Sequence, residues 1–254
     1  MASQPIYQLY VELEEYKPKI WRRFQVQNNI TMAKLGYIIM TIFEMQASHL
    51  FCFDVQVLEN IRKSTGKKEW ENMQSYVMEL FYKNPHLRDK HIALPFDSGF
   101  DDLEEGAIDA SKVKLGKILS HEKETMTFTY DYGDNWEIYI CLEKIIVDKE
   151  LPGKELPRVL DGAGYGIVED CGGRTGLKEM SQAFKRGKGR VYQEYSQWLG
   201  VDIFDFVTFD IEDMNYRVKK VPRIYREIYE YDIEPTKRSM DILVRNYKNR
   251  SRER

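Results

Sequence analysis

Residues 130–137 read Tyr-Asp-Tyr-Gly-Asp-Asn-Trp-Glu (YDYGDNWE), and they separate two segments in which apolar and polar residues alternate. The alternation runs through residues 126–132 on one side and through residues 136–142 on the other. A period of two is typical of a strand with one buried face, and a Gly-Asp-Asn cluster between two such strands predicts a turn. The sequence therefore predicts a β-hairpin whose core-facing side chains are Tyr130, Tyr132 and Trp136.

The composition indicates one large folded domain. The chain has 254 residues, of which 43% are hydrophobic and 13% aromatic, so it can bury a sizeable core. No apolar stretch approaches the roughly 20 residues that cross a bilayer, and the N-terminus does not resemble a signal peptide. We therefore expect a cytoplasmic protein without a membrane partner. Three cysteines without a C-x-x-C pair, and four histidines without ligand-like spacing, do not indicate a zinc site or a disulfide scaffold.

The hydrophobic pattern predicts an α+β fold with a mixed or antiparallel sheet. It opens in the order β-β-α-β, with strands at 6–14, 20–26 and 50–58 and a helix at 32–45 that Thr31 caps. Residues 60–120 are less regular, with a helix expected at 70–82 and a short one at 112–119. We interpret this segment as an insertion that covers part of the sheet.

The second half of the chain predicts a helical C-terminal part. Residues 151–176 are rich in Gly and Pro and are expected to form a long loop. Helices are expected at 177–184, 191–199 and 209–218, the last capped by Asp210. We assign residues 1–220 to the domain and residues 221–254 to a basic, helical extension.

Charge is distributed unevenly, although the net charge is only −3. Residues 97–109 contain six acids and no Lys or Arg, whereas residues 174–190 contain six bases and one acid. Residues 215–254 contain twelve bases and six acids. This asymmetry is consistent with a surface for nucleic acid or an acidic protein partner, and equally with a solvated helical face.

Four segments together resemble the plasmid pRiA4b ORF-3-like family over about residues 5 to 220. The first consists of Pro18–Phe24 and, after the helix, His49–Phe53. The other three are Tyr130–Glu143, Glu169–Gly173 and Phe209–Arg217. The resemblance implies an α/β-roll type of fold and an association with plasmids and mobile elements. The chain has Ile138 where the family usually has His, and Ile167-Val168 where it often has Pro-Pro. Some members are labelled as resolvase-like, but this chain lacks a recombinase constellation of Ser and Arg.

Five carboxylates form the candidate binding site around the hairpin and the glycine-rich loop: Asp131, Asp134, Glu137, Glu169 and Asp170. Such a cluster can hold a divalent cation through oxygen, the one cofactor that the sequence leaves open. Asp side chains in turns also accept hydrogen bonds from turn amides. Alternation places Asp131 and Glu137 on the face opposite the core, where water can solvate them.

The basic candidates lie in two places. Arg22 and Arg23 precede the first helix, and we expect Trp21 to pack inward while one arginine binds a phosphate or an acid such as Glu137. The other basic candidates follow Gly172-Gly173; they are Arg174, Lys178, Lys185 and Arg186. The glycines suggest anion binding by amides at the start of a helix, or only a tight loop. The P-loop, dinucleotide and nucleophile-elbow patterns are absent, so no catalytic residue is assigned.

Three functions remain consistent with these residues. The first is a non-enzymatic binding module, associated with a mobile element, that contacts nucleic acid or an acidic protein. The second is a metal-dependent hydrolase of a phosphorylated or nucleotide substrate, in which the five carboxylates hold the cation and Arg174 stabilises developing charge. The third is a protein that binds a partner through the acidic residues 97–109.

Overall fold

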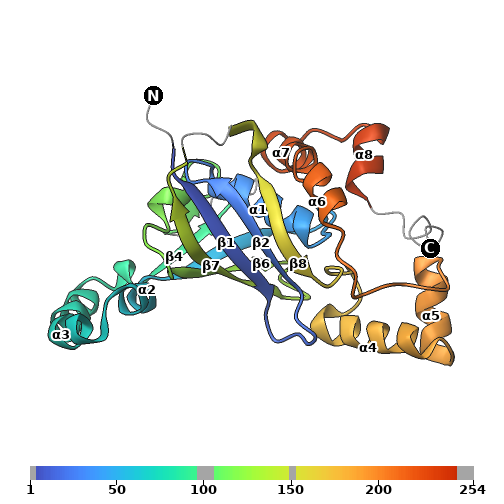
Figure 1. Cartoon of the computed structure of the whole chain (residues 1–254), viewed down its shortest axis with the longest axis horizontal. Coiled ribbons are helices and arrows are strands. Elements are labelled where there is room, and N and C mark those ends of the chain that lie inside the picture. Colours follow the sequence, from blue (N-terminus) through green and yellow to red (C-terminus); the bar gives the residue numbers. More distant parts are fainter. Residues whose placement is uncertain (1–3, 96–105, 149–152, 245–254) are drawn as a thin grey trace.

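The computed structural model describes residues 4–95, 106–148 and 153–244, and its centre is an eight-stranded sheet (Figure 1). The strand order is β5-β4-β3-β6-β7-β1-β2-β8, and every neighbouring pair is antiparallel except β4 and β5. The strands are β1 Ile6–Leu13, β2 Trp21–Gln27, β3 Phe51–Gln56, β4 Asp89–Ala93, β5 Ile108–Asp109, β6 Thr125–Tyr130, β7 Trp136–Ile146 and β8 Arg158–Ala163. The predicted α+β class with a mixed sheet is confirmed.

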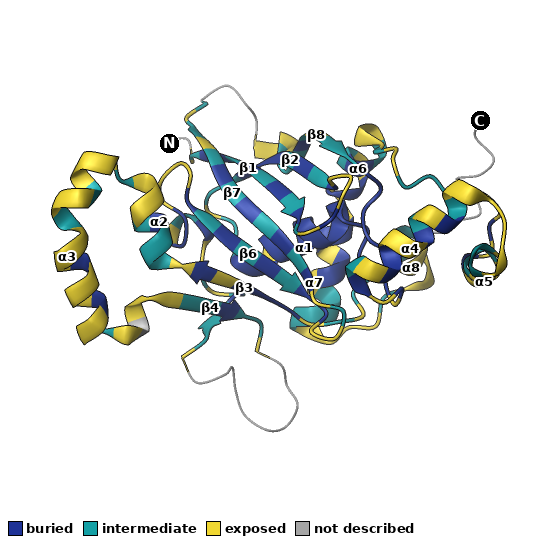
Figure 2. Ribbon diagram, turned by 90° about the horizontal axis from the view of Figure 1, so that it is seen from below, coloured by how far each residue is buried: buried dark blue, intermediate teal, exposed yellow. Residues whose placement is uncertain are grey.

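Helices pack against one face of this sheet and extend from its ends. The α-helices are α1 Met32–Ile42, α2 Val57–Ser64, α3 Lys67–Lys83, α4 Gly173–Arg186, α5 Arg190–Leu199, α6 Ile211–Arg217, α7 Val221–Tyr231 and α8 Lys237–Leu243. Short 3-10 turns occur at Pro85–Leu87, Leu115–Lys117 and Gly153–Glu155. Figure 1 shows α1 behind the strands and α4 to α8 gathered at one end. Along β1, β6 and β7, half-buried residues of the other face alternate with the buried residues of the core face (Figure 2).

The predicted hairpin is formed by β6 and β7, whose last pair is Tyr130 with Trp136. Both of these aromatics are fully buried, as expected, but the prediction for Tyr132 is wrong because its side chain is 55% exposed. The strand alternation ends at Asp131, whose φ of 57° turns the chain. The Asn135 amide then donates to the Asp131 carbonyl at 2.7 Å. The turn thus rotates Asp131 inward and Tyr132 outward.

The opening β-β-α-β order is confirmed, and Thr31 caps α1 by accepting from the Lys34 amide. The expectation that Trp21 packs inward is wrong. Along β2 it is Arg22 that faces the core with no exposed surface, whereas Trp21 lies on the opposite face and stacks on Tyr10. The side chains of a strand alternate, so the buried Phe24 two residues later fixes this orientation.

The segment 60–120 contains the expected helix, as α3, but it also adds β4 and β5 to one edge of the sheet. Its two helices extend away from the strands instead of covering them (Figure 1). The residues expected to form a plain loop at 151–176 include β8, which pairs with β2. Gly162 allows this strand to pack closely, because a Cβ there would lie 2.8 Å from the Phe209 ring.

The chain after residue 220 is helical, as predicted, and it also packs into the core. Val221, Ile224 and Tyr225 of α7 are buried, and the rings of Tyr225 and Tyr37 of α1 stack 6.1 Å apart. Residues 245–254, which carry part of the predicted basic extension, lie outside the described residues. Among the described helices, none combines the length and the apolar character needed to span a bilayer.

Candidate functional site

Two of the four segments singled out in the sequence, the hairpin and the glycine-rich loop, meet at the buried carboxylate of Glu169. Its Oε1 accepts hydrogen bonds from the Tyr130 hydroxyl and from the Gln46 amide, each at 2.6 Å. The Tyr130 hydroxyl also accepts from the Ser48 amide at 3.1 Å. Burial, with the neighbouring Glu169 charge, raises the pKa of Tyr130 well above its usual value, so this hydroxyl stays protonated and donates. Glu169 therefore joins the hairpin to the chain between α1 and β3.

His49 lies beside this network, between two of the predicted acids. Its Nε2 is 3.5 Å from Asp131 Oδ2 and 3.6 Å from Asp170 Oδ1, and its ring meets the edge of Tyr130. Asp131 Oδ1 accepts a hydrogen bond from the Gly133 amide at 2.9 Å. This is the bonding to a turn amide that the sequence offered as the alternative to cation binding. Asp170 is largely exposed. The hairpin turn and the glycine-rich loop are thus brought together around a histidine.

The hairpin turn and the glycine-rich loop also meet at Asp134 and Glu137. A Cβ on Gly173 would lie 2.9 Å from the Asp134 carbonyl oxygen, so the loop packs directly on the turn. Glu137 accepts from Arg174 at 3.0 Å, and Glu15 lies 3.8 Å from the same guanidinium. Arg174 is therefore paired with neighbouring acids, which does not support its predicted role in stabilising developing charge.

The five carboxylates do not converge on one point. Within residues 4–95, 106–148 and 153–244, the one group of three His, Cys, Asp or Glu ligand atoms within 4.8 Å of one another lies elsewhere, at Cys52, Asp54 and His91. Ligand oxygens of a shared cation must lie closer together than this limit. The geometry therefore gives no support to a cation shared by Asp131, Asp134, Glu137, Glu169 and Asp170.

The two arginines of β2 have different environments. The guanidinium of Arg22 donates to four main-chain carbonyls at 2.7–2.9 Å and lies 4.0 Å from the Phe209 ring centroid. Arg23 instead forms a two-point ion pair with Glu143 at 2.6 and 2.8 Å. This arginine lowers the pKa of the Glu143 carboxyl. The acid expected as a partner, Glu137, pairs with Arg174 instead.

The other basic candidates lie on a solvent-exposed surface formed by α4 and α5. Lys178, Lys185 and Arg186 of α4 are exposed, and Lys188 and Arg190 continue the surface across the turn. We call these five side chains the basic tip. Arg190 pairs with Glu194 at 2.9 Å, whereas the other four have no acidic partner in the described part of the chain. Gly187 and Gly189 adopt φ of 62° and 100°, which permits the sharp turn seen in Figure 1.

A cavity of about 660 Å³ lies between the start of α1, the segment before β8 and the start of α7. Its wall contains one acid, Glu230, and five bases: Lys34, Lys154, Lys219, Arg223 and Arg226. We call it the basic cavity. Burial, together with the nearby Arg158 and against the pull of Glu155, lowers the pKa of Lys219. The sequence does not reveal this site, because its bases come from three distant segments.

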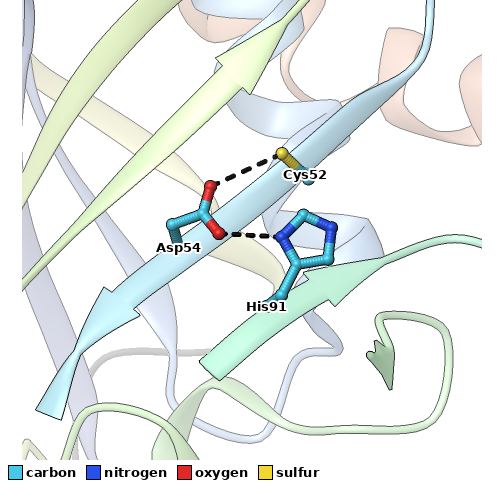
Figure 3. A group of neighbouring side chains, drawn as sticks. All are labelled: Cys52, Asp54 and His91. Carbon is cyan, nitrogen blue, oxygen red and sulfur yellow. Dashed lines mark hydrogen bonds and ion pairs between the residues drawn. The ribbon is translucent and has the colours of Figure 1, made fainter. Parts of the chain in front are cut away.

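The cluster of Cys52, Asp54 and His91 was also missed (Figure 3). Cys52 and Asp54 are two residues apart on β3, a signal that they share a face, but the strand that carries His91 was not predicted. Burial, together with the neighbouring Asp54 charge, raises the pKa of the Cys52 thiol to about 11. Spacing along the sequence indicates metal ligands only when they lie close together in the chain, so it cannot reveal a cysteine and a histidine that meet on neighbouring strands.

The fold and these sites define an α+β protein in which a hairpin turn and a glycine-rich loop meet beside a mixed sheet. The model of the family described as "Plasmid pRiA4b ORF-3-like protein" matches residues 5–213, and the chain belongs to this family. It is 23% identical over 214 residues to the "Uncharacterized protein y4hQ" of Sinorhizobium fredii (strain NBRC 101917 / NGR234), covering 84% of this chain and 90% of that protein.

A solved structure supports the same family. The crystal structure of the "Protein of Unknown Function MM3350" from Methanosarcina mazei Go1 is similar with a TM-score of 0.62 and 26% sequence identity. The match covers 83% of this chain and 98% of that chain. The family and fold inferred from the four sequence segments are confirmed, and neither relative's name states an activity.

Proposed function

We propose that this chain is a non-enzymatic module that binds nucleic acid through the basic tip of α4 and α5. The observation that carries the proposal is the set of four exposed cations without an acidic partner among the described residues: Lys178, Lys185, Arg186 and Lys188. Some exposed bases elsewhere, such as Arg62 and Lys83, are instead paired with acids on the same helix. An unneutralised cluster retains its full attraction for a polyanion.

The local geometry suits a phosphate backbone. A hollow of about 490 Å³ at the turn is lined by Arg186, Lys188, Gly189, Arg190 and Val191. The two helices are joined by a three-residue turn that contains two glycines, and this connection is also used by helix-turn-helix proteins. Gln193 and Gln197 lie on the exposed side of α5, and amide side chains of this kind can contact base edges. The basic cavity adds five further bases elsewhere on the molecule.

The test is a mobility-shift titration with single- and double-stranded DNA and RNA at rising salt. The variant Lys185→Glu/Arg186→Glu is compared with Lys67→Glu/Lys68→Glu, which makes the same charge change on the exposed start of α3. We expect the tip variant to lose at least tenfold in affinity. For duplex DNA, the slope of log K against log salt should flatten by about 1.8, since each neutralised phosphate contributes about 0.9.

The control variant is expected to bind within about twofold of the unaltered protein, because α3 carries no part of the tip. Equal losses in both variants would contradict the assignment to the tip. Failure of the unaltered protein to bind any of the four nucleic acids at low salt would overturn the proposal, and an acidic protein would then be the better candidate. The hydrolase hypothesis stays a prediction, and no geometric observation favours it.

A further inference from the structure

Three side chains with metal-binding atoms meet on the face of the sheet opposite α1. Cys52 and Asp54 alternate with the buried Phe53 on β3, and Asp54 lies directly opposite His91 of β4. Cys52 Sγ is 3.7 Å from Asp54 Oδ2, and His91 Nδ1 is 2.7 Å from Asp54 Oδ1. Figure 3 shows the thiol and the imidazole ring each facing a different oxygen of the Asp54 carboxylate.

We propose that Cys52, Asp54 and His91 form a binding site for a zinc ion. Zinc accepts thiolate, carboxylate and imidazole ligands at about 2.0–2.3 Å, which in a tetrahedron separates the ligand atoms by roughly 3.3–3.6 Å. The Cys52 sulfur and the His91 nitrogen contact different oxygens of Asp54, Oδ2 at 3.7 Å and Oδ1 at 2.7 Å. One ligand atom from each of the three residues lies within 4.8 Å of the others, and side-chain rotation brings these atoms to the tetrahedral spacing without moving either strand.

The ligand set selects the metal. Magnesium and calcium bind oxygen atoms and do not use a thiolate, whereas zinc binds sulfur and nitrogen readily. One thiolate and one carboxylate together carry two negative charges, so a divalent ion makes the centre neutral. Three protein ligands leave a fourth position open for water or another ligand.

The position is accessible to an ion and supported by the fold. Cys52 is 4% exposed, so its thiol is held firmly by its surroundings, while about half of the Asp54 side chain and a third of the His91 side chain reach solvent. Both strands lie inside the eight-stranded sheet, β3 between β4 and β6, and strands fix side-chain positions more closely than loops do. The site does not involve α4 or α5, so it is independent of the proposed nucleic-acid surface.

The same chain provides matched comparisons. His121 lies 3.1 Å from Glu124, which is a histidine–carboxylate pair without a cysteine. Cys141 is a half-buried cysteine on the same sheet that has no such pair within ligand distance among the described residues. If zinc binding required only a histidine–carboxylate pair or only a cysteine, these residues would bind it as well as the cluster does.

The experiment is a titration of the metal-free, reduced full-length protein with cobalt(II), followed by displacement with zinc. Cobalt bound to a thiolate gives a sulfur-to-metal charge-transfer band in the near ultraviolet, and tetrahedral cobalt gives strong visible bands. We expect one equivalent of cobalt to produce both and zinc to remove them. Cys52→Ser is expected to abolish the charge-transfer band, and His91→Asn to weaken binding at least 30-fold, while Cys141→Ser and His121→Asn leave both properties unchanged.

Absence of a thiolate band in the unaltered protein would overturn the proposal, as would a band that survives Cys52→Ser. Binding by His91→Asn as tight as that of the unaltered protein would also overturn it. Because Cys52 is buried, circular dichroism checks that its variant is folded. His91 is partly exposed, so its variant keeps the proposal falsifiable if the cysteine variant does not fold.

Discussion

Arg22 and Arg23 show how far the environment of one side chain changes its role. They are adjacent in β2, so their side chains point to opposite faces of the sheet. Arg22 is fully buried and joins the end of α1 to the end of β8 through main-chain carbonyls, whereas Arg23 forms a partly exposed ion pair. Burial converts the first arginine into a structural crosslink, because its donors have no water to replace the carbonyls.

We therefore predict unequal effects of the same substitution at these two positions. Arg22→Lys should lower the free energy of unfolding by about 3 kcal/mol, because an ammonium cannot reproduce the planar set of donors and leaves buried carbonyls unpaired. Arg23→Lys should cost about 1 kcal/mol or less, as is usual for an exposed pair. Urea unfolding measures both. Equal losses of unfolding free energy in the two variants would show that the hydrogen bonds of Arg22 to main-chain carbonyls contribute nothing beyond its positive charge.

At the residue scale, the sequence predicted some positions correctly and reversed others. Alternation placed Tyr130 and Trp136 in the core, because the strand geometry continues up to those residues. It failed for Asp131 and Tyr132, since a positive φ in the turn ends the alternation. The meeting of His49 with the turn could not be predicted, because periodicity carries no information about contacts between distant segments.

At the scale of elements, the strongly periodic segments were predicted and the short edge strands were not. β5 has two residues and β8 contains a glycine, so neither shows a run of alternating apolar residues.

The helix α3 is attached to the rest of the fold by few buried side chains. Its buried residues are Val77 and Phe81, which lie outside the main core cluster, while Tyr76 and Tyr82 are largely exposed. This helix therefore depends on very little apolar burial.

We predict that α3 opens independently of the sheet. Amide hydrogen exchange should be faster in α2 and α3 than in β1 and β7, because local opening exposes less apolar surface there. Phe81→Ala should accelerate exchange throughout α3 and leave β7 unchanged, whereas Phe128→Ala, in the main core, should accelerate exchange across the whole sheet. Mass spectrometry of peptic fragments measures the difference. Uniform acceleration by both variants would mean that α3 folds as one unit with the sheet.

At the scale of the whole molecule, the fold extends beyond the family match. The match ends at residue 213, yet α7 begins at Val221 and packs on α1. The Tyr225 hydroxyl donates to the Met45 carbonyl, and the Tyr229 hydroxyl to the His49 carbonyl. α7 therefore holds the same segment, between α1 and β3, that contacts Glu169 and Asp131. α7 and the candidate site are therefore parts of one packed unit.

This arrangement predicts that the chain cannot be shortened to the matched region. Deleting residues 214–254 removes the buried Val221, Ile224 and Tyr225, each worth about 1.5–3 kcal/mol of burial, which is comparable with the entire stability of a typical domain. We expect the shortened chain to lose its cooperative thermal transition. Deleting only residues 245–254 should leave the melting temperature within about 3 °C, because α7 and α8 are retained. A cooperative transition in the shorter chain would show that residues 1–213 fold without α7.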